Sequence, residues 1–163
     1  MCQADFCAAL LQKMKELGIH TAVDTSGYVS REALKKVIPY TDIFLYDIKH
    51  VDSEKHQYYT GVPNKQILEN LVYLNEQGKT VEIRIPIIPT VNDDAVTIHG
   101  IGALLAEHPN IQAVRILTYN DLAGSKYEML GKESTLPQEK PLDDEKMGVI
   151  QSVLGSYGLN VVW

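Results

Sequence analysis

The chain has 163 residues, enough for one domain with a buried core, and its net charge is −6. This acidic balance argues against a nucleic-acid partner, which needs a basic face. No apolar run approaches the ~20 residues of a membrane span and no signal-peptide pattern is present, so we expect a cytoplasmic protein with no membrane partner.

The first predicted element is an amphipathic helix over residues 3–17, which ends at Gly18. Its apolar stripe consists of Phe6, Leu10, Met14 and Leu17. With no strand ahead of it, this helix is expected to need a missing strand to pack on. A short strand over residues 20–24 then runs into a turn, and Ser30 is the expected N-cap of a helix that reaches residue 37.

The strand predicted over residues 43–49 is apolar and ends in two charges, Asp47 and Lys49. Strand side chains alternate between faces, so these two point the same way. One interpretation is a solvated ion pair worth ~0–1 kcal/mol. The other is one wall of a site that holds a charged small molecule at the mouth of a partial barrel.

The second half of the chain continues to alternate helices with strands. A short helix from residue 53 carries His56, for which a packing or surface role is favoured over catalysis. The clearest alternating strand covers residues 80–85, and Pro86 is expected to end its pairing because proline cannot donate to a ladder. The remaining predictions are helices over 64–77, 92–107 (capped by Asn92 and Asp93) and from Asp143, strands over 113–119 and 159–163, and a loop over 122–142.

Strands that alternate with helices every ~25–35 residues predict βαβ units and a parallel sheet, an α/β fold. Polar residues follow the strand ends: Asp24, then Asp47 and Lys49, then Arg84, then Asn120. In parallel barrels the ligand site lies at these carboxyl ends. Each residue also has a structural interpretation: Asp24 and Asn120 suit turns or caps, and Arg84 suits an ion pair.

An inward carboxylate beside an ammonium suits a zwitterion or a sugar as ligand. Asp24 and Asp47 together could hold a hard cation through oxygen ligands. A rival interpretation is an aldolase-like lyase in which Lys49 forms a Schiff base, although a neighbouring carboxylate favours the charged ammonium and weighs against it. A non-enzyme rival is a stand-alone ligand-binding or partner-docking module.

Several motifs occur in one order and at similar intervals in a known family. They are DTSG (24–27), YDIK (46–49), HQYYTGV (56–62), IRIPIIP (83–89) with ND (92–93), and KYEMLG (126–131). The chain resembles, from residue 3 to residue 163, the radical S-adenosylmethionine enzymes that activate glycyl radical enzymes. The resemblance implies part of a six-stranded partial (β/α) TIM-like barrel, with parallel strands inside and helices outside.

The family's cluster-binding CxxxCxxC loop and its Gly-Gly-Glu-Pro turn do not occur in the sequence. Residues 1–163 are therefore expected to be a single truncated radical SAM core domain without the cluster-binding strands. The resemblance gives the [4Fe–4S] cluster to the full-length parent only, and Cys2 and Cys7 are not expected to be its ligands. We expect this chain alone to be inactive and, with apolar surface uncovered, to self-associate.

By resemblance, the cofactor S-adenosylmethionine contacts Asp24, Asp47, Ile48, Lys49 and Asn120. Asp47 corresponds to an aspartate that contacts the ribose, and Lys49 to a lysine that meets the methionyl carboxylate. Asn120 stands where some members have a ribose-contacting histidine, and an asparagine can still donate and accept a bond.

The resemblance also implies a monovalent cation. Its ligands would be the Asp24 and Asp47 carboxylates with the backbone carbonyl groups of Thr25 and Leu45. The implied reaction of the parent is reductive cleavage of S-adenosylmethionine to a 5′-deoxyadenosyl radical. That radical takes a hydrogen atom from a glycine of a partner glycyl radical enzyme, such as pyruvate formate-lyase. A flavodoxin- or ferredoxin-type protein is the implied electron donor.

Overall fold

The computed structural model describes residues 3–119, 129, 131 and 139–163. In that part of the chain five strands form one sheet in the order β1-β2-β3-β4-β5, and every neighbouring pair is parallel. The strands are β1 (Ala22–Thr25), β2 (Ile43–Asp47), β3 (Thr80–Ile87), β4 (Ile111–Thr118) and β5 (Val161–Val162). The α/β fold with a parallel sheet, predicted from the alternation of elements, is confirmed.

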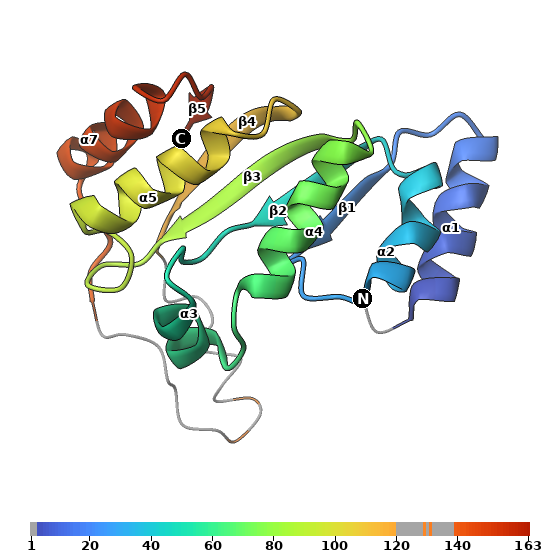
Figure 1. The fold of residues 1–163 in the computed structure, drawn as a ribbon, viewed down its shortest axis with the longest axis horizontal. Coiled ribbons are helices and arrows are strands. Elements are labelled where there is room, and N and C mark those ends of the chain that lie inside the picture. The colour runs from blue at the N-terminus through green and yellow to red at the C-terminus, as the bar shows by residue number, and fades with distance from the viewer. Residues whose placement is uncertain (1–2, 120–128, 130, 132–138) are drawn as a thin grey trace.

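The helices are α1 (Ala4–Glu16), α2 (Arg31–Val37), the 3-10 helix η1 (Ile38–Tyr40), α3 (Ser53–Thr60), α4 (Lys65–Glu76), α5 (Ala95–Ala106) and α7 (Asp144–Gly155). Helix α1 precedes β1, and the other helices lie between successive strands. Figure 1 shows α1, α2, α4, α5 and α7 in a row that follows the strand order, while α3 lies apart, at the end toward which β2 and β3 point. No helix in the described ranges is both long and apolar enough to cross a membrane.

The two faces of the sheet differ in burial. Phe44 and Tyr46 of β2 are fully buried, whereas Ile43, Leu45 and Asp47, which alternate with them, are half-buried. Strand β3 shows the same alternation. One face therefore packs under the helices and forms the core, and the opposite, more open face carries Asp47.

Most predicted helix caps are confirmed, and one is wrong. The Ser30 hydroxyl accepts a bond from the Ala33 N–H, and the Asp143 carboxylate accepts one from the Lys146 N–H. Helix α5, however, is capped by Asp94, which accepts bonds from the N–H and the hydroxyl of Thr97, rather than by Asn92 or Asp93. Asp94 caps the helix instead because the Asn92 side chain is buried and bonds the backbone of other residues.

The prediction that Pro86 ends the pairing of its strand is also wrong. Strand β3 runs to Ile87, and Pro86 pairs with Leu117 of β4. Backbone groups of alternate residues point to alternate neighbours, so Pro86, like Arg84, turns its backbone toward β2. Strand β2 has ended by that point, because its last bond runs from the Ile48 N–H to the Arg84 carbonyl, at 3.0 Å. The N–H that a proline lacks would have pointed past the end of β2, so among the described strands no hydrogen bond is sacrificed.

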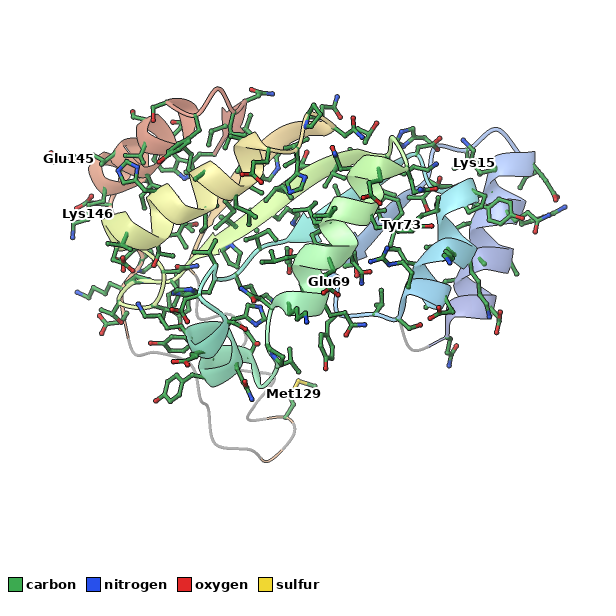
Figure 2. All side chains as sticks on the ribbon, in the orientation of Figure 1. Lys15, Glu69, Tyr73, Met129, Glu145 and Lys146 are labelled. Carbon is green, nitrogen blue, oxygen red and sulfur yellow. The ribbon has the colours of Figure 1, made fainter. Side chains whose placement is uncertain are left out.

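The predicted apolar stripe of α1 does not face the core. Phe6, Leu10 and Leu17 are exposed, and Cys7, Ala8 and Leu11 pack against the core instead. The helix itself and its end at Gly18, which has a positive φ of 72°, follow the prediction. Ion pairs help to hold it, including one from Lys15, labelled in Figure 2, to Asp42 at 2.5 Å.

Candidate functional site

The charged pair predicted at the end of β2 lines a pocket. Lys49 Nζ lies 3.7 Å from Asp47 Oδ2, and the lysine side chain is 41% exposed. A cavity of about 260 Å³ is bounded by this pair with Ser26 and Tyr28 of the β1–α2 loop. A second cavity of about 350 Å³ shares Lys49 and is lined further by Tyr59, Ile88 and Val91, among others. Lys49 thus stands between two adjoining hollows at the carboxyl end of the sheet.

Burial raises the pKa of the Asp47 carboxyl, and the positive charges of Lys49 and Arg84 oppose this rise. The negative charge of Asp24 adds to it. A half-buried carboxylate of this kind gains from a donor brought by a ligand, such as a sugar hydroxyl, while the lysine ammonium can pair with a ligand carboxylate. The pair can therefore hold a small molecule that carries both groups.

Asp24 lies on the open face and is paired with Arg84. The Arg84 guanidinium reaches across β2 and contacts the Asp24 carboxylate, with Nη1 2.6 Å from Oδ2. The structural interpretation of Arg84 as an ion-pair residue is confirmed, although its neighbour Glu82 pairs with Arg115 instead, at 2.8 Å. The Asp24 side chain is 61% exposed, so this ion pair contributes little to stability.

The other predicted site residues differ in how they could meet a ligand. Leu45 is the Cα partner of Asp24, so the two lie side by side on adjacent strands. The Thr25 hydroxyl accepts a bond from the Gly27 N–H at 3.0 Å. Ile48 is 2% exposed on the helix-covered face, which leaves only its backbone available to a ligand. Asn120 lies outside the described residues, as does most of the loop predicted over 122–142.

Lys49 does not have the surroundings of a Schiff-base lysine. Such a lysine is activated by desolvation or by a second cation. Lys49 is partly exposed, and the charged group beside it is the Asp47 carboxylate. Nothing in this arrangement favours the aldolase interpretation.

The described residues do not fit an iron–sulfur cluster. Across 3–119, 129, 131 and 139–163, no three His, Cys, Asp or Glu side chains gather in a way that could hold a metal ion. Cys7 is a free thiol on α1. No step of chemistry on this chain is therefore assigned to such a cluster.

Three buried asparagines bond backbone groups at the carboxyl end of the sheet, a role that the sequence did not predict. In each, the side-chain amide nitrogen donates to two backbone carbonyl groups: Asn64 to His50 and Val51, Asn70 to Gly27 and Val29, and Asn92 to Lys49 and Pro86. Asn70 has a sequence signal, since it falls on the apolar stripe of α4 at helical spacing from Ile67 and Leu74. The sequence predicts Asn92 only as a helix cap, because its partners Lys49 and Pro86 come together only when β2 and β3 pair.

Helix α4 also helps to position the β1–α2 loop through Arg31. Its guanidinium donates to the Asn70 side chain at 3.2 Å and to the Glu69 carbonyl at 3.2 Å. It also lies 4.2 Å from the centre of the Tyr73 ring, a cation–π contact. Glu69 and Tyr73 are labelled on this helix in Figure 2. The loop that carries Ser26 and Tyr28 is therefore held in place by the contacts that Arg31, at the start of α2, makes with helix α4.

Two further motif residues have structural explanations. Gly27 has a φ of 73°, and a Cβ atom there would lie 1.9 Å from the hydroxyl oxygen of Tyr46, so only glycine fits. That hydroxyl donates to the Ile67 carbonyl at 2.7 Å. His56 is buried, and its Nδ1 bonds the Val62 carbonyl at 2.7 Å, so of the predicted packing or surface role the packing alternative is confirmed. The contacts of Gly27 and His56 thus stabilise the segments that line the pocket.

Known proteins resemble this chain over nearly its whole length. The choline trimethylamine-lyase activating enzyme of Oleidesulfovibrio alaskensis is 34% identical over 98% of this chain and 52% of its own length. The trans-4-hydroxy-L-proline dehydratase activating enzyme of Clostridioides difficile is 38% identical over 87% and 49%. The pyruvate formate-lyase 1-activating enzyme of Escherichia coli K12 is 31% identical over 99% and 66%. The chain spans about half to two thirds of the length of these relatives.

Solved structures show the same fold. A domain of the pyruvate-formate lyase-activating enzyme from Bacteroides vulgatus superposes with a TM-score of 0.83 at 28% identity, over 99% of this chain and 91% of that one. Streptococcus suis SuiB bound to S-adenosylmethionine gives a TM-score of 0.70 at 16% identity, over 94% and 33%, which bears on the fold alone. The family model of the radical SAM superfamily matches residues 1–99, more than half of the sequence. The chain therefore belongs to the radical SAM superfamily.

Proposed function

We propose that this chain is the S-adenosylmethionine-binding part of an activating enzyme that generates a glycyl radical on a partner glycyl radical enzyme. The observation that carries the proposal is the Asp47–Lys49 pair, which lines a pocket at the carboxyl end of the sheet in a radical SAM chain. The names of its relatives support the choice of partner class.

The pocket residues suit the two ends of S-adenosylmethionine. The Lys49 ammonium would pair with the methionyl carboxylate, and the Asp47 carboxylate would accept bonds from ribose hydroxyls. Asn120 is proposed as a further ribose contact, and the Ile48 backbone as a further contact of the cofactor. Bound S-adenosylmethionine supplies the radical chemistry of the family, whereas this chain orients it and limits the access of water.

Ligand binding tests the roles of these residues directly. Titration calorimetry of the 163-residue chain with S-adenosylmethionine should give binding that Lys49→Ala weakens about tenfold, since a hydrogen bond to a charged group is lost. Lys65→Ala is the matched control, because this lysine of α4 is 82% exposed and pairs only loosely with Glu69. Equal affinities for the wild type and Lys49→Ala would rule out the proposed carboxylate contact.

The partner class needs a separate test in the full-length protein that carries this chain. With S-adenosylmethionine and a reductant, it should produce a glycyl radical doublet in the electron paramagnetic resonance spectrum of one purified glycyl radical enzyme. Choline trimethylamine-lyase, trans-4-hydroxy-L-proline dehydratase and pyruvate formate-lyase are the first to try, from the names of the relatives. A spectrum without the doublet for every glycyl radical enzyme of the source organism would refute the proposed activity.

We extend the proposal to a monovalent cation held by the Asp24 and Asp47 carboxylates and by the Thr25 and Leu45 carbonyl oxygens. Oxygen ligands of this kind suit a hard cation. The cation would share Asp24 with the Arg84 guanidinium. S-adenosylmethionine should then bind more tightly in potassium chloride than in tetramethylammonium chloride of equal ionic strength, and Asp24→Asn should remove the difference. Identical affinities in the two salts would argue against the cation.

The remaining parts of the proposal rest mainly on the family resemblance. We propose a flavodoxin- or ferredoxin-type electron donor, a cytoplasmic location and a single radical SAM core domain over residues 1–163. Self-association is supported by the exposed Phe6, Leu10 and Leu17 of α1 and, separately, by the position of β1 at the edge of the described sheet. Sedimentation at rising concentration should show it, and a monomer throughout would contradict it.

The isolated chain is expected to hold no [4Fe–4S] cluster. Its only cysteines are Cys2 and Cys7, at a spacing unlike that of the family motif. Treatment with iron and sulfide should leave no stoichiometric cluster absorbance. A full cluster spectrum would overturn this expectation.

A further inference from the structure

The β2–β3 ladder ends beside Pro86, and the side chain of Asn92 lies just beyond its last bond. After the bond from the Ile48 N–H to the Arg84 carbonyl, the next rung of a parallel ladder would use a backbone N–H at residue 86. Residue 86 is a proline and has none. The two strands part here, where β2 has ended, and beyond this point the carbonyl groups of Lys49 and Pro86 accept bonds from the Asn92 side chain.

The side chain of Asn92 fills this opening. Its amide nitrogen lies 2.9 Å from the Lys49 carbonyl oxygen and 2.8 Å from that of Pro86. Its amide oxygen accepts a bond from the Ile88 N–H at 2.8 Å. Asn92 is 1% exposed, so these bonds are shielded from water, and loss of the side chain would leave buried backbone groups unpaired.

The turn that presents Asn92 is itself held by backbone bonds. The Asn92 N–H donates to the Ile88 carbonyl at 3.2 Å, and the Asp93 carboxylate accepts a bond from the Thr90 N–H at 2.8 Å. Helix α5 begins directly after this turn, with its cap at Asp94. These bonds hold the turn in one conformation, so the Asn92 amide is held against the backbone of Lys49.

We propose that Asn92 is a positioning residue that fixes the backbone of Lys49, so that the lysine ammonium meets the carboxylate of the bound ligand. This inference rests on the proposed binding of S-adenosylmethionine. Lys49 lines both cavities, as do His56 and Thr60, and its side chain is partly exposed. Because its side chain has many rotamers, a fixed backbone is the means by which the fold can direct its charge.

The test compares two ligands that differ in the group that Lys49 would bind. S-adenosylmethionine carries the amino-acid carboxylate, and 5′-methylthioadenosine lacks the carboxylate together with the amino group and the sulfonium charge. The part of the preference that Lys49→Ala removes is therefore the measure of the carboxylate contact. The wild type should prefer S-adenosylmethionine by about tenfold, from one charge-assisted bond. Asn92→Ala should lower this preference to about threefold or less while leaving the dissociation constant of 5′-methylthioadenosine within about twofold.

Asn70→Ala is the matched control. Asn70 is equally buried and also donates to two carbonyl groups, but these belong to Gly27 and Val29 in the β1–α2 loop. Its loss should weaken both ligands alike and leave their ratio unchanged. In a Lys49→Ala background, Asn92→Ala should have no further effect on the ratio, because the group that it positions is gone.

The possible outcomes separate the proposed contact of Lys49 with the ligand carboxylate from the proposed positioning role of Asn92. A wild type without any preference refutes the proposed carboxylate contact and this inference with it. A wild type that prefers S-adenosylmethionine, combined with an Asn92→Ala variant that keeps the preference, refutes the inference alone. Equal weakening of both ligands by Asn92→Ala shows a merely structural role. If Asn92→Ala does not fold by circular dichroism, Asn92→Ser, whose hydroxyl can donate one of the two bonds, takes its place under the same criteria.

Discussion

The centre of the sheet and its N-terminal edge are built in different ways. At the centre, β2 and β3 bury a continuous set of apolar side chains, and buried amides tie their exits to the neighbouring loops. At the edge, α1 has no buried residue, and β1 pairs on one side only. The charged pair of the candidate site belongs to the centre, whereas Asp24 belongs to the edge. Rigid packing thus supports the pair, and the edge contributes an exposed ion pair.

The chain offers matched residues with which to measure this difference. Its two phenylalanines lie one in each region: Phe44 in β2 is fully buried, and Phe6 in α1 is 63% exposed. Among the positive-φ glycines, Gly27 follows β1 but lies against Tyr46 of the central strand β2, whereas Gly18 ends α1 in open space. Among the histidines, His50 follows β2 and is buried, whereas His20 precedes β1 and is exposed. Substitutions in such pairs change the same chemistry in two environments.

The phenylalanine pair should show the largest effect. Phe44→Ala empties a core position and should lower the free energy of unfolding by about 3–5 kcal/mol. Phe6→Ala removes an exposed ring and should change it by less than about 0.5 kcal/mol. Urea denaturation followed by circular dichroism measures both. Similar costs for the two variants would mean that the edge is as firmly packed as the centre.

The glycine pair should show the next largest effect. Gly27 and Gly18 have nearly the same φ, 73° and 72°, but a Cβ at Gly27 would overlap the Tyr46 side chain, whereas one at Gly18 meets nothing within 4 Å. Gly18→Ala should therefore cost only the backbone strain, about 1 kcal/mol, and Gly27→Ala about 2–4 kcal/mol. Urea midpoints report both. A difference below about 0.5 kcal/mol would show that Tyr46 moves aside freely.

The sequence predicts the regular parts of this fold well, because local signals determine them. The Ser30 and Asp143 caps and the shared face of Asp47 and Lys49 follow from side-chain chemistry and strand alternation. The failures occur where a second element decides the outcome. Pro86 continues its strand because β2 has already ended beside it, and the stripe of Phe6 and Leu10 stays exposed because no described element covers it.

In the candidate site, too, local signals predict some features, whereas others depend on a second element. The charged pair is predictable from one strand alone. An arginine on a strand also pairs with an acidic residue more often than it contacts a ligand, so the ion pair of Arg84 is the expected outcome. That its partner is Asp24, 60 residues earlier, depends on the register of three strands. The sequence predicts Asn92 only as a helix cap and a motif residue, and its contacts with Lys49 and Pro86 could not be predicted for the same reason, since they depend on how the ends of β2 and β3 lie.

The histidine pair should show the smallest effect, and it depends on pH. His50 is 3% exposed, and its Nδ1 accepts a bond from the Asp52 N–H at 3.0 Å, so the neutral ring carries its proton on Nε2. Burial lowers the pKa of His50, with the positive charge of Lys55 acting in the same direction. A lowered pKa means that the unfolded chain takes up the proton first as the pH falls. The stability that the neutral ring provides is therefore complete above the unfolded pKa of about 6.5 and is lost as the pH falls toward the lower folded value.

His50→Asn removes this titration and keeps an acceptor for the Asp52 N–H. The decrease in urea midpoint between pH 7.5 and 5.5 should become smaller in this variant. It should not vanish, because burial also lowers the pKa of His108. His20 is exposed, so His20→Asn should leave the decrease as it is in the wild type. If His50→Asn and His20→Asn reduce the decrease equally, the protonation of His50 is not coupled to the packing of the centre, and the contrast between the two regions does not extend to their electrostatics.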